Sequence, residues 1–461
     1  MKSIHFVGVS GIGMSALASI CLDIGYSVSG SADTENAQTD ALMQKGMKFY
    51  LGHSASHVDR PDIVVRSAAV PVENEEVREA ERRGIPVSVY AEFLGQLMSK
   101  KRGIAVGGTH GKTTTTAMTG GILRHAHLDP SVVCGGVMRN FDTNALYGLG
   151  DYFIAEACEY QRSFLNLRKW YSIITNIEAE HLDYYRDLPD IKRAFADFLR
   201  TADGRGFAVI NGDDANVMEV VNDLEGLNAR TVGFGEENQY RIEELENRNG
   251  YYSFQMAGGD GEELLHISLM VPGRFNCINA ALSAVLALNL GISRRTIQES
   301  LRTFLGTGRR LEYLGTRGMQ HLYTDYAHHP TEIESALGTL REVHTGMDLC
   351  VVFQPHQYSR TAKLFRGFVD TLLRADCIIL TEIYKQRDSD EYIKAVSSQD
   401  LFREIKKLGG NRRIALVRDD EELFTLLSEQ NLPSEETGMV VAFLGAGDID
   451  EAARRYAALP L

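Results

Sequence analysis

Residues 107–116 read GGTHGKTTTT and decide the fold of the central part of this chain. An apolar run at 103–106 precedes them, and the pattern after them predicts a helix over 114–125. A strand, a glycine-rich turn, a lysine, a hydroxyl residue and a helix form the arrangement of a phosphate-binding loop. In such a loop, backbone N–H groups and a helix N-terminus hold anionic oxygens. We therefore predict that this stretch binds the phosphates of a nucleotide.

Two side chains of the loop carry the predicted chemistry. Lys112 is expected on the outer phosphates, and the hydroxyl of Thr113 on a magnesium ion. Val106 stands where the general pattern G-x-x-x-x-G-K-[ST] has its first glycine, so Gly107 and Gly108 are expected to supply the turn. A strand-to-helix turn that binds no phosphate is the alternative interpretation.

Length and composition restrict the class of protein. A chain of 461 residues is too long for one hydrophobic core and suggests about three domains. The net charge of −14 argues against general nucleic-acid binding, which needs a basic face. The six cysteines form no C-x-x-C pair, which predicts reduced, buried thiols; they are Cys21, Cys134, Cys158, Cys277, Cys350 and Cys377. No signal peptide and no apolar run of roughly 20 residues is present, so we expect a cytoplasmic protein without a membrane span.

The first hundred residues predict a Rossmann-like unit. A strand at 4–7, a turn with three glycines at 8–13, a helix over 14–24 and a strand at 26–29 follow one another. Ser10 stands where the usual fingerprint has its second glycine, so the signal for a diphosphate at the helix N-terminus is weak. A plain strand–helix turn is the alternative. Residues 100–103 read as a linker, and a first domain is expected to end at residue 101.

The second and third parts of the chain also alternate strands and helices. In the second, strands are predicted at 152–156, 171–176 and 207–211, antiparallel strands over 240–270 and a helix at 276–290. In the third, strands are predicted at 320–324, 349–353, 377–381, 414–417 and 439–444. The prediction is therefore an α/β protein of three domains, with boundaries 1–101, 102–308 and 309–461.

Polar residues follow several of these strands. Glu156, Glu159, Asn176 and His181 come at or after strand ends of the second part, and the carboxyl ends of parallel strands are where ligands bind. We expect them at the same edge as Lys112. In the third part, arginines beside the clusters at 325–330 and 354–360 are of the kind that clamps phosphate or carboxylate.

The ordered series of motifs resembles the Mur ligase family over essentially the whole chain. The segments are HFVG at 5–8 and on through Ser15, GTHGKTTT at 108–115, AEACE at 155–159, TNIEAEHLD at 175–183, PGRFN at 272–276, RRLE at 309–312, DYAHHP at 325–330 and FQPHQYSRT at 353–361. Each segment alone is a weak signal, whereas chance agreement would have to recur along three domains.

The resemblance implies a Rossmann-like N-terminal domain, a central P-loop ATPase-like domain and a C-terminal Rossmann-like domain. It implies ATP-dependent amide formation between L-alanine and the lactyl carboxylate of UDP-N-acetylmuramate, through an acyl phosphate, in peptidoglycan precursor synthesis. ATP and Mg²⁺ are the implied cofactors. Both a monomer and a homodimer stay open.

The resemblance also implies roles for individual residues. The nucleotide would be held by Gly108, Thr109, His110, Gly111, Lys112, Thr113, Thr114, Asn176, Asn276, Asn279, Arg310 and Asp325, and magnesium by Thr113, Glu156 and His181. The UDP diphosphate would lie on Ser10, Gly11, Ile12, Gly13, Met14 and Ser15, with His53 and Ser67 on the uridine side. Tyr326, His356 and Arg360 would line the face that takes ATP and alanine. The catalytic set would be Lys112, His181, His328 and Arg360, with the base for the amine open between the two histidines.

The sequence departs from the family pattern at a few positions. Cys158, Tyr160 and Gln161 replace two acids and a serine beside the metal site, and Phe275 replaces a frequent histidine. Gln357 stands where many members have arginine, which moves alanine-carboxylate binding toward Arg360 and puts the amino-acid specificity in doubt. Three other functions stay open: a ligase that adds a ready-made peptide to the same nucleotide sugar, a nicotinamide oxidoreductase, and a non-enzymatic nucleotide-dependent switch.

Overall fold

The computed structural model describes residues 2–259, 261–385, 388–428 and 438–460. The chain divides into two compact units. The first unit holds Met1–Leu245, Phe254–Ser268 and Phe275–Leu305, and the second holds Glu246–Ser253, Leu269–Arg274 and Gly306–Leu461. None of the helices within the described residues has the length and apolar content needed to cross a membrane.

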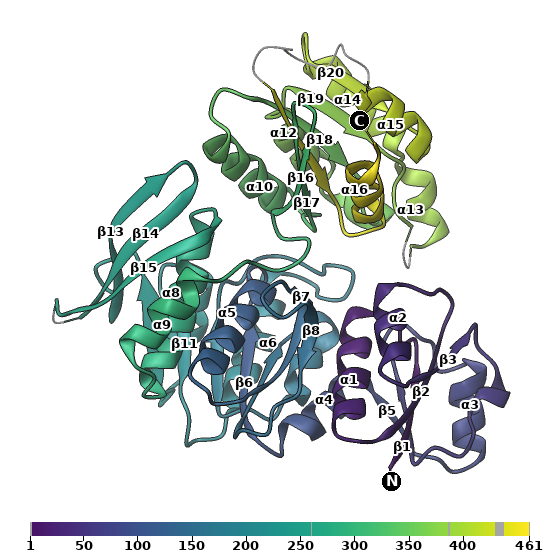
Figure 1. The fold of residues 1–461 in the computed structure, drawn as a ribbon, viewed down its shortest axis with the longest axis vertical. Coiled ribbons are helices and arrows are strands. Elements are labelled where there is room, and N and C mark those ends of the chain that lie inside the picture. The colour runs from purple at the N-terminus through teal and green to yellow at the C-terminus, as the bar shows by residue number, and fades with distance from the viewer. Residues whose placement is uncertain (1, 260, 386–387, 429–437, 461) are drawn as a thin grey trace. The chain divides into compact units, whose positions relative to one another are not determined.

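The chain begins with a five-stranded parallel sheet in the order β3-β2-β1-β4-β5, the arrangement of a Rossmann-like half (Figure 1). Its elements are β1 (Ser3–Val7), α1 (Ile12–Asp23), β2 (Ser27–Ala32), α2 (Ala37–Gln44), β3 (Lys48–Leu51), η1 (Ala55–His57), β4 (Ile63–Arg66), α3 (Glu75–Arg82), β5 (Val87–Val89) and α4 (Tyr90–Met98). Alternate residues of β1 serve opposite faces. Ile4 and Phe6 join the core that contains α1 and α4, whereas Val7 joins Val77 and Ala80 of α3.

A ten-stranded sheet follows, in the order β15-β14-β13-β12-β11-β10-β6-β9-β7-β8. Its strands are β6 (Arg102–Gly107), β7 (Ser131–Met138), β8 (Thr143–Leu146), β9 (Tyr152–Glu156), β10 (Tyr171–Ile174), β11 (Ala208–Asn211), β12 (Ala229–Gly233), β13 (Tyr240–Arg248), β14 (Tyr251–Gly258) and β15 (Glu263–Pro272). β6 lies between β9 and β10 and is parallel to both, so the polar residues after all three strands share one edge.

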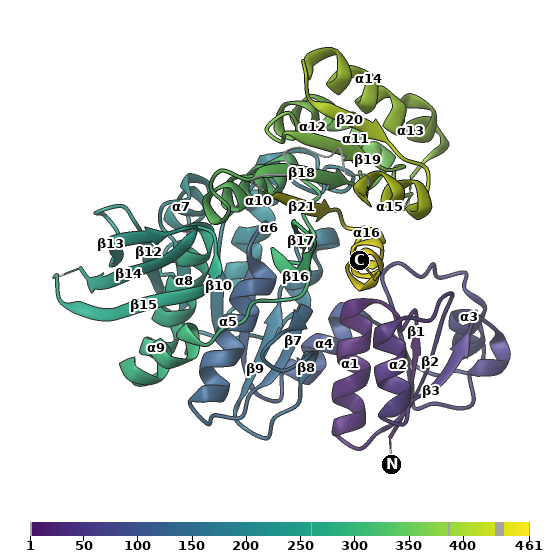
Figure 2. The same cartoon turned by 45° about the horizontal axis from the view of Figure 1, so that its top comes forward.

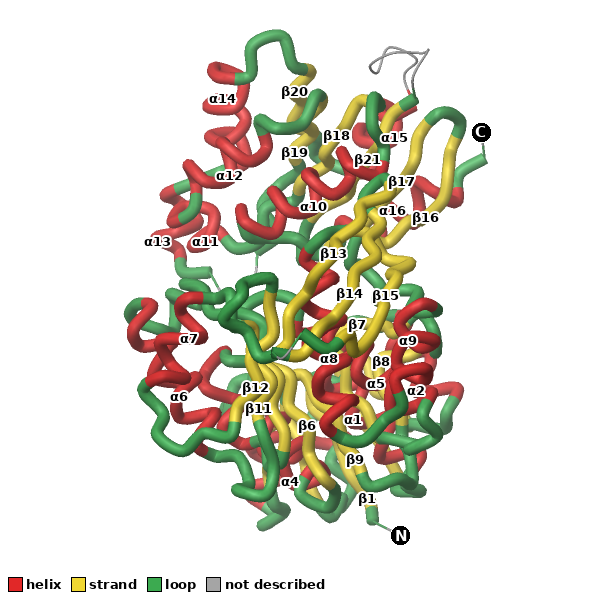
Figure 3. The backbone as a smooth tube through the Cα atoms, turned by 90° about the vertical axis from the view of Figure 1, so that its left-hand side faces the viewer, coloured by secondary structure: helices red, strands yellow, loops and turns green. Residues whose placement is uncertain are grey.

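Helices cover both faces of this sheet. They are α5 (Lys112–His125), α6 (Leu188–Arg200), α7 (Ala215–Asn222), α8 (Phe275–Asn289) and α9 (Arg294–Arg302), with the short η2 (Tyr160–Asn166). Figure 3 shows α6 and α7 on one side of the yellow strands and α5, α8 and α9 on the other. Buried hydroxyl contacts join α5 to α8, with Thr119 Oγ1 donating to Ser283 Oγ at 3.1 Å.

The second unit contains a six-stranded sheet in the order β16-β17-β21-β18-β19-β20 (Figure 2). Its elements are β16 (Glu312–Arg317), β17 (Gln320–Asp325), α10 (Pro330–Val343), β18 (Asp348–Phe353), α11 (Tyr358–Lys363), α12 (Phe365–Leu372), β19 (Cys377–Leu380), α13 (Asp390–Ala395), α14 (Ser398–Leu408), β20 (Arg413–Leu416), α15 (Asp420–Ser428), β21 (Met439–Leu444) and α16 (Ile449–Ala458). Only the pair β16–β17 is antiparallel among the ladders of this sheet's described residues. Alternate strand residues feed two cores, one under α10, α12 and α14 and the other under α15 and α16.

The predicted α/β fold of three domains is confirmed, since the described residues form three sheets, and local corrections follow. Residues 102 and 103, predicted as linker, belong to β6, because Arg102 donates to Asp151 O and starts the ladder with β9. The helix of the loop begins at Lys112 and not at residue 114. Five cysteines are buried as predicted, but Cys158 is exposed, since it follows the end of β9 in the turn before η2. Of the predicted antiparallel segment, residue 260 lies outside the described residues.

Candidate active site

Two glycines give the phosphate-binding loop its shape. Gly108 has φ +139° and Gly111, the N-cap of α5, has φ +81°, a region that L side chains rarely adopt. A Cβ on Gly108 would lie 1.9 Å from Thr175 Oγ1, and one on Gly111 would lie 2.6 Å from Asn279 Oδ1. Both positions therefore need glycine for backbone conformation and for space.

The residues after β10 hold the loop from the side. Asn176 accepts from the N–H of His110 with its Oδ1 at 2.8 Å and donates to the carbonyl of His110 at 3.1 Å. Thr109 N donates to Asn176 O at 3.0 Å, and Thr109 Oγ1 accepts from Glu178 N at 2.8 Å. Asn176 thus lies against the loop, and its side chain is engaged in shaping the loop.

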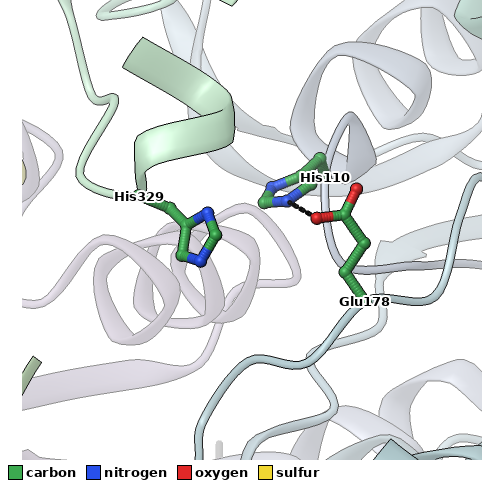
Figure 4. A group of neighbouring side chains, drawn as sticks. All are labelled: His110, Glu178 and His329. Atoms are coloured by element: carbon green, nitrogen blue, oxygen red, sulfur yellow. Dashed lines mark hydrogen bonds and ion pairs between the residues drawn. The ribbon is translucent and has the colours of Figure 1, made fainter. Parts of the chain in front are cut away.

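The His110 side chain is oriented by Glu178, an acid of the segment that follows β10. Its Nε2 lies 3.4 Å from Glu178 Oε2, and Figure 4 shows the ring facing this carboxylate. His329, drawn in the same view, belongs to the second unit.

Lys112 lies at the centre of a charged cluster. Its amine donates to the carbonyls of Gly108 and Thr109 and lies 3.1 Å from Glu159 Oε2. Burial alone would lower the pKa of Lys112, but the charge of Glu159 raises it above the usual value. Burial would likewise raise the pKa of Glu159, and Lys112 and His181 hold it below its usual value. Lysine and glutamate are therefore both ionised near neutral pH.

Three side chains beside Lys112 form a group that could hold a metal ion. The ligand atoms of Glu159, Glu180 and His181 lie within 4.8 Å of one another, and His181 Nε2 is 3.6 Å from Glu159 Oε1. Carboxylate oxygens are the ligands that magnesium prefers. The residues present therefore fit a divalent cation.

The predicted metal ligands overlap only partly with this group. His181 belongs to it, whereas Glu156 does not; its Oε2 accepts from Gly135 N at 2.9 Å. Thr113 is buried in the first turn of α5. Glu156 nevertheless ends β9 beside Val106 of β6, at the edge where the loop starts.

Helix α8 brings two predicted nucleotide residues to the loop. Asn279 accepts from Thr115 Oγ1 at 3.2 Å and donates to Asn276 Oδ1 at 3.1 Å, and all three residues are buried. The first residue of the helix, Phe275, has a side chain that is 41% exposed. Asn279 lies next to Gly111, and the exposed ring at 275 keeps a flat apolar face available for stacking.

The first turn of α1 supplies the predicted diphosphate residues. The helix starts at Ile12, and its N-cap Gly11 has no side-chain cap, so the first N–H groups of the helix are not capped by a side chain. Asn144 of β8 donates to Ile12 O at 2.7 Å and to Ser15 Oγ at 3.1 Å. Asn36 donates to Ser10 O at 3.0 Å. A Cβ on Gly13 would lie 2.8 Å from the ring of Tyr90, so the close approach of this ring to α1 favours glycine there.

The remaining first-sheet residues of the prediction lie at the carboxyl ends of strands. Ser67 follows β4, and its Cβ would be 3.1 Å from a Cβ built on Gly8. His53 follows β3 and contacts Ser31 and the buried Glu76. Met14 is buried in the first turn of α1 and packs in the core.

The second unit gathers its predicted residues at one edge of its sheet. Arg310 lies over the ring of Tyr326 with its Cζ 5.1 Å from the centroid, and the His328 ring lies 5.2 Å from Tyr326 and 6.0 Å from His356. Arg360 Nη1 lies 3.2 Å from His356 Nδ1. The prediction that these side chains form one face of this domain is thus consistent with their mutual distances.

Asp325 has a more specific local role than predicted. Its Oδ2 accepts from Leu311 N at 2.6 Å and its Oδ1 from Ala327 N at 2.7 Å. Burial raises the pKa of Asp325 to about 6, against the opposing charge of Arg310. The carboxylate ties the segment that enters β16 to the end of β17.

Some residues of these sites were not found from the sequence. Glu180 and Glu178 lie in the TNIEAEHLD segment, where the acids could have been considered as ligands. Asn144 and Glu76 gave no local signal, because their contacts join segments 129 and 45 residues away along the chain.

Family models match three consecutive segments of the chain. Residues 3–102 match the model described as Mur ligase family, catalytic domain, residues 106–287 the Mur ligase middle domain, and residues 309–447 the Mur ligase, glutamate ligase domain. Together these matches cover most of the chain.

Curated relatives extend the similarity to full length. The UDP-N-acetylmuramate–L-alanine ligase of Aquifex aeolicus is 40% identical over 98% of this chain and 96% of its own length. The protein of the same name from Caldicellulosiruptor saccharolyticus is 39% identical over 98% of this chain and 97% of its own.

Solved structures share the architecture. The UDP-N-acetylmuramate-alanine ligase of Thermotoga maritima superposes with a TM-score of 0.84 at 29% identity, covering 99% of this chain and 98% of that one. The murein peptide ligase of Psychrobacter arcticus superposes with a TM-score of 0.76 at 20% identity, covering 100% of both chains. At that identity the similarity supports the fold alone.

Proposed function

This chain belongs to the Mur ligase family, and from that membership we propose that it joins L-alanine to the lactyl carboxylate of UDP-N-acetylmuramate in an ATP-dependent reaction of peptidoglycan precursor synthesis. The observation that carries the proposal is the 40% identity with a full-length relative of that name, over 98% of this chain. The ATP dependence follows from the family. We expect the reaction in the cytoplasm, where ATP is available.

The reaction has two steps. The carboxylate attacks the γ-phosphate of ATP, which gives an acyl phosphate and ADP. The neutral amine of alanine then attacks the activated carbonyl through a tetrahedral intermediate, and phosphate leaves. Catalysis of the first step is mainly positioning and charge stabilisation.

The first unit supplies the groups for the phosphoryl transfer. The N-terminus of α5 and the ammonium of Lys112 bind the transferring phosphate, and the charge cluster with Glu159 keeps that ammonium protonated. Thr113, Glu156 and His181 would hold magnesium, with Glu159 and Glu180 close enough to share the task. The ion would neutralise charge on the phosphates.

We assign the second substrate to the second unit. Arg360 and His356, 3.2 Å apart, are proposed to bind the alanine carboxylate, with Tyr326 and Arg310 beside them. Asp325 is proposed to face the ribose through oxygen lone pairs that its two backbone contacts leave unused. His328 and His181 are the two candidates for the base that deprotonates the amine.

The division into domains is part of the proposal. We retain boundaries at residues 101 and 308, which lie close to the limits of the matched segments at 3–102, 106–287 and 309–447. The first domain would bind the nucleotide sugar, the second ATP, and the third alanine together with ATP.

The test measures phosphate release with UDP-N-acetylmuramate and ATP across a panel of amino acids. We expect release with L-alanine and much less with glycine, L-serine or a tripeptide. Preference for the tripeptide would reassign the chain to the peptide-adding ligases. Nucleotide binding without amino-acid-dependent phosphate release would favour a non-enzymatic nucleotide-dependent switch. NAD binding seen by fluorescence would favour an oxidoreductase.

A further inference from the structure

The N-terminal five-stranded sheet and its helices enclose a buried carboxylate with histidines around it. Glu76, in the first turn of α3, has no exposed surface. Its Oε1 lies 2.7 Å from His57 Nδ1, and its Oε2 lies 2.5 Å from Ser31 Oγ and 3.0 Å from His53 Nδ1. The fully buried His5 lies with its Nε2 3.7 Å from Glu76 Oε1.

Glu76 is ionised in this environment. Burial alone would raise its pKa, but His5, Ser31 and His53 lower the pKa to about 2. An ionised carboxylate only accepts hydrogen bonds, so the Nδ1 atoms that face it carry their hydrogens. This cluster is not among the groups of the described residues that are compact enough to hold a metal ion. It is therefore a hydrogen-bonded network.

The network fixes which nitrogen of His53 is available to a ligand. With Nδ1–H directed at Glu76 and Ser31, the other nitrogen, Nε2, lies on the side of Asp33, 3.7 Å from its Oδ1. Asp33 is 84% exposed, so this side of the ring borders the surface. A second partner that sets the tautomer and orientation of a binding histidine is a common device.

The same network reaches the glycine turn after β1. The carbonyl of Ser31 accepts from the N–H groups of Gly8 and Val9, both at 2.9 Å, while its hydroxyl donates to Glu76. Ser31 lies beside the carboxyl end of β1, because β1 and β2 are parallel and Val7 pairs with Ser31. Glu76 is thus coupled to the position of His53 and to the start of the proposed diphosphate loop.

We propose that Glu76 is a positioning residue for the nucleotide sugar, which holds His53 as the Nδ1–H tautomer with Nε2 directed to the ligand. The inference rests on the proposed function, because it gives His53 a substrate to bind. His57 holds the other oxygen of the Glu76 carboxylate, and its own ring is held by stacking on Tyr50, with ring centroids 4.2 Å apart.

The experiment compares Glu76→Gln with Glu75→Gln, the same change on the exposed neighbour in the same helical turn. The amide introduced by Glu76→Gln can donate as well as accept, so it no longer dictates the tautomer of His53. We expect the KM for UDP-N-acetylmuramate to rise about tenfold in Glu76→Gln, by analogy with the loss measured when the outer partners of metal-binding histidines are removed. The kcat and the KM for ATP should stay within about twofold, and Glu75→Gln should match the wild type.

Two further readouts separate positioning from a general loss of structure. Selective ¹⁵N-histidine spectra should show the His53 ring, assigned with His53→Asn, as the Nδ1–H tautomer in the wild type and as a mixture in Glu76→Gln. Adding Glu76→Gln to His53→Asn should raise KM little further, because residues that act through one contact are not additive. An unchanged tautomer, or a KM increase equal in both backgrounds, would overturn the proposal.

Binding of UDP alone, measured by calorimetry, keeps this test independent of the ligase assignment. If the wild type binds UDP but forms no amide, the proposed function fails while the role of Glu76 can still be decided. Weaker UDP binding in Glu76→Gln than in Glu75→Gln then supports the role, and equal binding in the two variants contradicts it.

Discussion

At the scale of single residues, the candidate active site depends on charges that lie close together and are partly shielded from water. Lys112 contacts the carbonyls of its own loop and the carboxylate of Glu159. His181 contacts the same carboxylate. The exposed Cys158, next to Glu159 in the chain, stands where the family commonly has an acid. With one negative charge fewer beside the proposed cation site, a bound ion would depend more on Glu156, Glu159 and Glu180.

The first prediction concerns the ammonium of Lys112. Lys112→Ala removes the charge that stabilises the transferring phosphoryl group, so ATP-dependent ligation should fall by about a hundredfold to a thousandfold. Circular dichroism should show that the fold is retained, because the glycine turns and the backbone contacts of the loop remain. The thermal midpoint should fall, because Glu159 loses its buried partner. Lys100→Ala, on an exposed lysine, serves as the control. Near-normal turnover of Lys112→Ala would refute the assignment of this loop.

The second prediction concerns a buried lysine remote from that cluster. Lys169 is 2% exposed and donates to Phe198 O at 2.6 Å and to Thr201 Oγ1 at 2.7 Å, and burial lowers its pKa to about 7. Between that value and the ordinary value of 10.5, the unfolded chain binds more protons than the folded one. Stability contributed by this site therefore rises with pH across the window, by at most about 1.4 kcal/mol per pH unit.

Lys169→Met should remove this rise. Urea unfolding at pH 7, 8 and 9 should show a smaller increase in the free energy of unfolding than in the wild type, whatever constant offset the lost hydrogen bonds cause. Lys100→Met should keep the wild-type slope. Parallel slopes for the wild type and Lys169→Met would show that the buried amine keeps its proton throughout.

At the scale of elements, the site is shaped by turns held in uncommon conformations. Gln161 and Arg162 of η2 have φ of 52° and 55°, and ion pairs of Arg162 with Asp190 at 3.0 Å and Asp197 at 3.4 Å offset the strain. Tyr185 donates to the carbonyl of Glu159 at 2.6 Å. Together these contacts fix the segment that carries Glu159. The helices around it use ordinary caps, such as Asp187, which accepts from Asp190 N at the start of α6.

The third prediction concerns a glycine inside α10. Gly338 is exposed within Pro330–Val343, and a Cβ built there meets nothing within 4 Å. Alanine loses less conformational entropy on folding than glycine does, so Gly338→Ala should stabilise the second unit by about 0.5–1 kcal/mol. The midpoint of guanidinium unfolding, followed by circular dichroism, measures the change. A lower midpoint would mean that this face of α10 is covered.

At the scale of the molecule, the same geometric rule applies to all three sheets. The proposed site residues follow the carboxyl ends of parallel strands: the turn after β1, the loop after β6 and the cluster after β17. The first two sheets also share one hydrophobic core inside the first unit, which includes Phe93 and Leu94 of α4 together with Phe164 and Leu167 of the η2 segment. Asn144 of β8, in the second sheet, adds a hydrogen bond to the carbonyl of Ile12 in α1, which packs on the first sheet.

The fourth prediction tests this shared core with a second glycine-to-alanine substitution, now in α4. Gly95 lies inside α4, and a Cβ there would be 2.1 Å from the carbonyl oxygen of Asn166. Gly95→Ala should therefore push α4 away from η2 and cost about 1–3 kcal/mol, opposite in sign to Gly338→Ala. Differential scanning calorimetry of the two variants checks the contrast. Stabilisation by both substitutions would show that α4 and η2 are not in contact.

Local patterns were enough to predict the strands, the phosphate-binding loop and the polar clusters at strand ends. Apolar periodicity, glycine turns and hydroxyl or lysine residues at set spacings are properties of short stretches of sequence. The positions of Lys112, His181 and Asn176 at one edge followed from the rule for parallel strands. The start of α5 two residues earlier than predicted shows the usual limit of boundaries read from propensity.

Contacts between distant segments could be seen only after folding. Glu76 looked like one of several acids on an amphipathic helix, and it becomes an organising group because β1, β2 and the turn after β3 bring His5, Ser31 and His53 to it. The exposure of Cys158, the group of Glu159, Glu180 and His181, and the contacts that Asn144 makes with the first turn of α1 have the same origin. Each depends on burial and distance across the fold, and neither quantity is encoded in the spacing of residues along the chain.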